Sequence, residues 1–312
     1  MKWQGRERSS NIEDRRSQGG GGLGGGLGGG LGGGMGGGLG PLGGGRIGGA
    51  RGGGLGLVGI VVVLGIIWFV TGQNPLEVLT GSGGTTTSSS TQSGQWAPST
   101  NAQEDELANF VGVVTKDTEN LWGEVFSENK LTYKPPTVVL FSNQTQSACG
   151  TAETSSGPFY CPNDKKVYID LAFYDQLRQQ FGAPGDFAQA YVIAHEIGHA
   201  VQDQTGILPE FNAKRGSMSQ DQQNAYSVRV ELQADCYAGV WANYAKKQNY
   251  LDQGDAEEAI KAANQIGDDT LTRGQVSSRN FTHGTSAQRM AWLKKGMDTG
   301  DVSQCDTFKG SI

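Results

Sequence analysis

Hydrophobic residues recur at helical spacing in three long segments of the C-terminal two thirds of the chain. Residues 104–126 carry apolar side chains every three or four positions, which predicts an amphipathic helix. A second helix is predicted over residues 186–202, with Asp186 as its N-cap and Gly206 just past its end. A third is predicted over residues 224–246, where several alanines and one glycine interrupt the larger side chains.

Short runs rich in strand-forming residues at 137–141, 158–161 and 166–170 predict β-strands between the first two helices. We therefore expect an α+β, helix-rich domain over residues 103–312, with a small antiparallel sheet packed on the second helix. The hairpin within residues 158–170 would offer an edge along which an extended peptide could pair through its backbone. A purely structural hairpin is the simpler alternative.

One long hydrophobic segment lies upstream of this domain. Residues 52–75 contain no charged side chain, and the apolar run extends over residues 55–70 with Trp68 and Phe69 near its end. This length is at the short end of what spans ~30 Å of hydrocarbon, so we predict a transmembrane helix over residues 54–72. A secretory signal peptide and a buried core helix are the alternatives.

The segments on either side of this helix are low in complexity. Between Gly19 and Gly59 lie 27 of the 51 glycines of the chain, with a leucine or methionine every fourth position from 23 to 39. Because glycine costs a helix about 1 kcal/mol per position, we expect a disordered, basic tail over residues 1–53. Self-association or contact with the membrane surface is a less favoured role for the repeat. Residues 73–102, rich in Gly, Ser and Thr, predict a flexible linker.

Charge predicts the orientation and excludes one class of partner. Arg46 and Arg51 precede the apolar segment and Glu77 follows it, so the positive-inside rule places the tail in the cytoplasm. The domain would then lie in the periplasm or outside the cell, anchored by a single pass through a bacterial inner membrane. After Arg51 the chain carries 18 basic and 28 acidic side chains, and this excess of negative charge argues against nucleic acid as a partner.

All four cysteines, Cys149, Cys161, Cys236 and Cys305, follow the apolar segment. An even number in an exported domain predicts disulfides, for which three pairings are possible. We favour Cys149–Cys161 with Cys236–Cys305, the pairing of nearest neighbours along the chain. A cysteine-rich zinc site is the rival interpretation, but the chain has no CxxC spacing.

The second helix contains the motif His195-Glu196-Ile-Gly-His199. Imidazoles at positions i and i+4 lie on one face of a helix, where both can reach one Zn²⁺ ion. Glu196 is rotated about 100° away from His195, so it is placed to accept a proton from water at the metal. The alternative is two structural histidines on one helix, but the chain has only three histidines in all.

A catalytic zinc needs a third protein ligand, and the third helix supplies a candidate. Glu231 and Asp235 lie four residues apart in a segment rich in alanine, whose small side chains would let two helices approach closely. We expect Glu231 to be the ligand and Asp235 to accept the outer N–H of a zinc-bound histidine. The alternative for both acids is a solvated helix face.

These motifs resemble the gluzincin group of zinc peptidases, with its HExxH and ExxxD elements. More closely, the chain resembles a bacterial family of membrane-anchored neutral zinc metallopeptidases. The similarity runs from Lys2-Trp3 through FYCPNDKKVYIDLAFY, AYVIAHEIGHAVQDQTG and ELQADCYAGVWA to THGTSAQRMAWL. It implies a zincin-like peptidase fold with one Zn²⁺ per chain.

The same resemblance implies a role for the third histidine. The segment from Thr282 to Arg289 is similar to the THP…R element of membrane zinc proteases, in which the histidine stabilises the oxyanion and the arginine braces the site or the substrate. His283 and Arg289 would take these roles, although Gly284 stands where that element has proline. The alternative is an ordinary loop histidine ahead of the last helix.

The sequence therefore predicts a membrane-anchored zinc peptidase, most simply an endopeptidase, acting on a peptide or protein of the cell envelope. Glu196 would serve as general base. An alternative of a different class is a non-catalytic zinc-binding envelope adaptor or assembly protein. The presence of Glu196 argues against the adaptor, because a structural zinc site needs no base.

Overall fold

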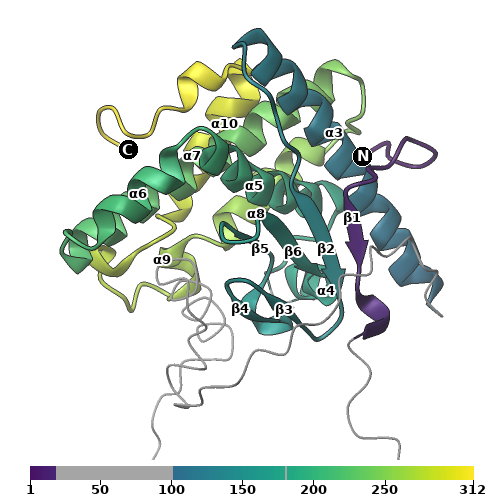
Figure 1. Cartoon of the computed structure of the whole chain (residues 1–312), viewed down its shortest axis with the longest axis horizontal. Coiled ribbons are helices and arrows are strands. Elements are labelled where there is room, and N and C mark those ends of the chain that lie inside the picture. Colours follow the sequence, from purple (N-terminus) through teal and green to yellow (C-terminus); the bar gives the residue numbers. More distant parts are fainter. Residues whose placement is uncertain (19–100, 180) are drawn as a thin grey trace, which may run out of the picture.

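The structure is a computed structural model that describes residues 1–18 and 101–312 except Gln180 (Figure 1). The predicted membrane helix over residues 54–72 and the rest of the tail lie outside the described residues, as does the linker apart from its last two positions. Among the residues described, no helix is long and apolar enough to cross a membrane.

Five helices surround the centre of the domain. The three long helices predicted from the sequence are α3 (Ala102–Glu128), α5 (Asp186–Gln204) and α7 (Gln220–Lys247). Two further helices, α8 (Asp255–Gln265) and α10 (Ser286–Thr299), pack with them. α5 is buried between its neighbours, as its almost continuous run of buried residues requires (Figure 1). Gly185 rather than Asp186 occupies its N-cap, and Asp186 instead accepts a hydrogen bond of 2.7 Å from the α-ammonium group of Met1.

The main sheet has four strands in the order β1-β2-β6-β5. They span Ile12–Asp14 (β1), Thr137–Phe141 (β2), Lys166–Asp170 (β6) and Phe159–Cys161 (β5). β1 and β6 both run parallel to β2, and only β5 is antiparallel to its neighbour. The hairpin predicted within residues 158–170 is therefore confirmed as β5 and β6, but the expectation of an antiparallel sheet is wrong for the β1-β2-β6 part. A separate antiparallel hairpin, which the sequence analysis did not predict, consists of β3 (Gln144–Ser147) and β4 (Gly150–Glu153).

The first 18 residues belong to the domain. β1 pairs with β2 (Figure 1). Trp3 packs edge-on against Phe110 of α3, and Arg6 forms a salt bridge with the buried Asp117. The prediction of a disordered tail is thus wrong for residues 1–18. A three-residue strand acquires its stability from the partner strand, and no local pattern marks it.

Short elements complete the domain. They are the helices α4 (Ala172–Gln179), α6 (Ile207–Arg215) and α9 (Asp268–Leu271), and the 3₁₀ turns η1 (Arg16–Gln18), η2 (Thr154–Ser156), η3 (Ser278–Asn280) and η4 (Val302–Cys305). Disulfides join Cys149 to Cys161 and Cys236 to Cys305, with Cα–Cα distances of 5.9 and 5.5 Å, which confirms the favoured pairing. The second disulfide ties the C-terminal segment to α7 beside the candidate site.

Candidate metal centre

The structure brings the side chains of His195, His199 and Glu231 together at the contact of α5 and α7. All three are buried, and one ligand atom from each lies within 4.8 Å of the other two. The Nε2 atom of His195 is 3.1 Å from one carboxylate oxygen of Glu231, and that of His199 is 3.5 Å from the other. Two imidazoles and one carboxylate are the protein ligands of many catalytic zinc sites, so the donor set fits Zn²⁺.

The close approach of the two helices depends on small residues. A Cβ atom placed on Gly198 would lie 3.4 Å from the backbone of Ala234, which is van der Waals contact, so the two helices touch at this level. Gly198 precedes one ligand on α5, and Ala234 lies between Glu231 and Asp235 on α7. The short side chain of Glu231 reaches the histidines because nothing larger separates the helices at this level.

Asp235 contacts Nδ1 of His195, the ring nitrogen that does not face Glu231. One of its oxygens lies 2.9 Å from Nδ1 of His195 and also accepts a hydrogen bond of 2.6 Å from the Tyr191 hydroxyl group. The guanidinium group of Arg289 donates to both oxygens, each at 2.9 Å. Burial opposes ionisation of Asp235, but Arg289 and His195 outweigh it and lower its pKa to about 2. The carboxylate is therefore ionised and keeps the Nδ1 proton of His195 in place.

His199 has a neutral partner that the sequence analysis missed. Its Nδ1 atom lies 2.8 Å from the side-chain oxygen of Gln202, whose amide nitrogen donates to the Val230 carbonyl group and to Gln233. A glutamine three residues after the last histidine of the motif is the only local signal for this contact. Gln202 orients the ring so that Nε2 remains for the metal.

Glu196 does not belong to the ligand group. Its carboxylate is buried, and burial raises its pKa to about 7. His195 and the backbone N–H of Tyr160 on β5 favour the ionised form and oppose this rise in pKa, whereas Glu231 adds to it. A carboxylate whose pKa lies near neutrality can both accept and return a proton at physiological pH.

His283 precedes α10, and its side chain is partly exposed. Burial lowers its pKa, but the nearby carboxylates of Glu231 and Asp268 outweigh this effect and raise it. Gly284 has a φ angle of 94°, which proline, with φ fixed near −65°, cannot adopt. The loop therefore differs from the proline-containing element that it resembles. Arg289 is buried against Asp235, so it braces the site rather than facing solvent.

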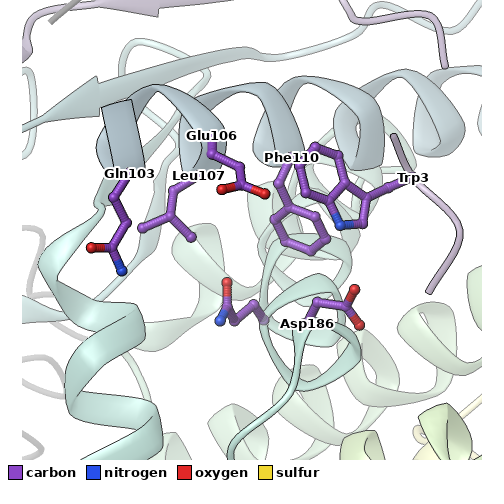
Figure 2. A pocket seen from close by; sticks show the side chains of 7 residues that line it. Trp3, Gln103, Glu106, Leu107, Phe110 and Asp186 are labelled. Carbon is purple, nitrogen blue, oxygen red and sulfur yellow. The ribbon is translucent and has the colours of Figure 1, made fainter. Parts of the chain in front are cut away.

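A separate small cavity of about 150 Å³ lies where the N-terminal segment meets α3 and the first turn of α5 (Figure 2). It is lined by Trp3, Gln103, Glu106, Leu107, Phe110, Asp186 and Gln189. Asp186 is nine residues before His195, about 13 Å along a helix. The cavity shares no residue with the metal centre.

Comparison with known proteins agrees with this site. The family model described as "putative neutral zinc metallopeptidase" matches residues 1–308. The Escherichia coli K12 protein YpfJ is 42% identical over 315 residues, covering 100% of both chains, and its function is uncharacterised. The uncharacterised Rv2575 of Mycobacterium tuberculosis H37Rv is 44% identical over 195 residues, which are 57% of this chain and 64% of that protein. No solved structure matches. The chain therefore belongs to the family described as "putative neutral zinc metallopeptidase".

Proposed function

We propose that this protein is a zinc-dependent endopeptidase. The observation that carries the proposal is the buried group of His195, His199 and Glu231. Glu196 lies next to this group as a fourth buried side chain that is not one of the three candidate ligands. Three protein ligands leave a tetrahedral zinc ion one position for water or substrate, as catalytic sites require. A structural site would be closed by a fourth protein ligand and would not need a buried carboxylate of raised pKa next to it.

When bound, Zn²⁺ would supply Lewis acidity that polarises a peptide carbonyl group and makes water a stronger acid. Glu196 accepts the proton that water releases as its oxygen attacks the carbonyl carbon. The same carboxylic acid then donates this proton to the amide nitrogen as the C–N bond breaks. His283 donates a hydrogen bond to the carbonyl oxygen as negative charge develops on it.

Strand β5 supports binding of an extended peptide. Among the described residues, β5 is an edge strand of the main sheet and pairs with β6 on one side only. The backbone N–H of Tyr160 within this strand favours the ionised form of Glu196, which supports a position of β5 next to the reacting groups. A peptide paired along the free edge of β5 would lie across the centre with chain on both sides of the scissile bond, which favours internal cleavage.

We also propose that residues 54–72 attach the enzyme to the cell membrane and that its substrate is a peptide or protein of the bacterial envelope. The apolar composition of this segment and the two disulfides support an exported, membrane-attached enzyme. A single crossing with a cytoplasmic N-terminus would require residues 1–18 to leave the domain on which they pack. If residues 54–72 instead attach to the membrane from one side, residues 1–18 can remain packed on the domain.

The test compares the full-length protein with its Glu196→Gln variant in detergent, supplied with one equivalent of zinc. We expect both to retain zinc, as measured by elemental analysis, and only the wild type to cleave casein and an internally quenched peptide library. Glu257→Gln, a change at an exposed glutamate of α8, is the matched control and should cleave normally. Cleavage by Glu196→Gln at the wild-type rate would refute the assignment of the base. Zinc binding without turnover in the wild type would refute the peptidase and favour the adaptor.

A further inference from the structure

Asp268, at the start of α9, forms several hydrogen bonds with the loop that carries His283. Its Oδ2 atom accepts hydrogen bonds from three successive backbone N–H groups, those of Thr282 and His283 at 2.8 Å and that of Gly284 at 3.1 Å. In return, the N–H of Asp268 donates to the Gly284 carbonyl group at 2.9 Å. One buried carboxylate thus determines the backbone conformation of the whole turn.

The other oxygen of the same carboxylate reaches the side chain. Oδ1 of Asp268 lies 3.2 Å from Nδ1 of His283. Burial opposes ionisation of Asp268, but His283 and the N–H groups outweigh it and lower its pKa, so the carboxylate can only accept. The contact therefore requires a proton on Nδ1. Nε2, on the far side of the ring, is left for a substrate oxygen.

The residue after Asp268 forms hydrogen bonds at the C-terminal end of the same turn. Asp269 accepts hydrogen bonds from the backbone N–H and the hydroxyl group of Ser286, at 2.7 and 2.9 Å. The two segments meet so closely that a Cβ atom on Gly267 would lie 2.3 Å from the Ser286 nitrogen. The sequence Gly267-Asp268-Asp269 is thus built to hold the turn before α10 rigidly.

We propose that Asp268 is a positioning residue for catalysis, which holds the His283 ring through Nδ1 and through its backbone so that Nε2 faces the oxygen of the reacting carbonyl group. This inference rests on the proposed peptidase function. A group that must stabilise a transient negative charge has to be oriented in advance, because reorientation during the reaction would cost part of the stabilisation. His283 is on a loop, and Asp268 supplies the rigidity that a helix gives to His195 and His199.

The first test is kinetic and compares Asp268→Asn, His283→Gln and the double variant. Asparagine has one side-chain oxygen, so it cannot serve both the three N–H groups and the ring. Loss of an oxyanion donor costs roughly 10²–10³-fold in kcat, and we expect His283→Gln to fall in this range. Asp268→Asn should lower kcat by about 10-fold or more with a smaller change in KM. The double variant should be no slower than His283→Gln, since Asp268 acts through that ring. Asp298→Asn, at an exposed position of α10, is the control and should match the wild type.

The second test needs no catalytic activity. The chain has only three histidines, so the ¹⁵N imidazole spectrum of the zinc-loaded full-length protein can be assigned with single substitutions. We expect a proton on Nδ1 of His283 that is lost or weakened in Asp268→Asn while the other two rings are unchanged. A His283 ring that is protonated on Nε2 alone would overturn the inference, as would kcat effects that multiply in the double variant. Absence of any cleavage by the wild type would overturn the proposed function and this catalytic role together.

Discussion

The two histidines of the candidate metal centre are held by partners of different charge. His195 faces the ionised Asp235, which is shared with Arg289 and Tyr191, whereas His199 faces the neutral Gln202. Because Asp235 is completely buried, its negative charge is tolerated only while Arg289 and the His195 proton compensate for it. The Asp235 carboxylate therefore both orients a candidate metal ligand and joins α5, α7 and α10.

This arrangement predicts the effect of Asp235→Asn. The amide cannot balance the buried guanidinium group of Arg289, and it holds the His195 ring less firmly. We expect zinc affinity, measured by competition with a chromogenic chelator, to fall about 10–100-fold, the usual effect of removing such a partner. We also expect a lower midpoint of thermal unfolding in the metal-free protein. Wild-type affinity in this variant would show that Asp235 does not orient the ligand.

The pKa of Glu196 predicts the acid limb of the pH–rate profile. The base must be ionised, and burial raises its pKa to about 7 in the protein without metal. A bound cation favours the ionised form, so kcat/KM should fall as pH decreases through a midpoint at or somewhat below 7. A profile that stays flat down to pH 4.5 would show that Glu196 is not the group whose ionisation controls the reaction.

At the scale of elements, the packing of α10 on α7 is the closest helix contact. Gly239 and Gly296 face each other across it, and a Cβ atom on either would lie 2.2 or 2.0 Å from a backbone oxygen of the other helix. The contact positions Arg289 of α10 beside Asp235 of α7. Two glycines therefore set the distance at which the arginine can reach the carboxylate.

Gly239→Ala tests this contact. The added methyl group would collide with the backbone of α10, and we expect a loss of about 1–3 kcal/mol in the free energy of unfolding, together with weaker zinc binding. Gly123→Ala is the matched control, because α3 has open space at that position and alanine favours a helix by roughly 0.5–1 kcal/mol. Equal stability of the two variants, measured by urea unfolding, would contradict the close approach.

For the whole molecule, the described domain is assembled from two parts of the chain, residues 1–18 and residues 101–312. The first part adds an edge strand to the main sheet and buries Met1 and Ile12 in the core (Figure 1). Its salt bridge between Arg6 and Asp117 joins it to α3.

The variant Arg6→Met measures how much the salt bridge between Arg6 and Asp117 contributes to the free energy of unfolding. Burial raises the pKa of Asp117 to about 6, with Arg6 opposing the rise, so removal of Arg6 should raise it further. The folded state then binds this proton more tightly than the unfolded state, and stability is lost as pH rises through the folded-state pKa. We expect a loss of roughly 1–3 kcal/mol at pH 8 and a smaller one at pH 5. Arg178→Met, which breaks an exposed pair, should show neither effect.

The two-part domain also predicts a topology. Residues 1–18 and 101–312 must lie on the same side of any membrane while they are packed together. Cysteines introduced one at a time at exposed positions, such as Lys2 and Lys309, should therefore be labelled equally by an impermeant maleimide in intact cells. Labelling of one position without the other would show that the segment over 54–72 separates the two parts in the cell.

Some features of the site were predictable because they are local. The HExxH spacing places His195 and His199 on one helix face, and the small residues around Glu231 indicated a close helix contact. Gln202, three residues beyond the motif, carries only a weak signal of its role. Asp268 carries none, because an aspartate 15 residues before His283 in a loop-rich stretch has no periodic relation to it.

Spacing along the chain and residue chemistry were enough to predict the candidate metal ligands, the candidate base, the main helices and a preferred pairing of the cysteines. The partners of these groups emerge only from the folded structure: Asp268 contacts His283, Arg289 contacts Asp235, and residues 1–18 supply an edge of the sheet. These contacts join segments that are far apart in sequence. Their free energy comes from burial and from mutual hydrogen bonding, which local periodicity does not record.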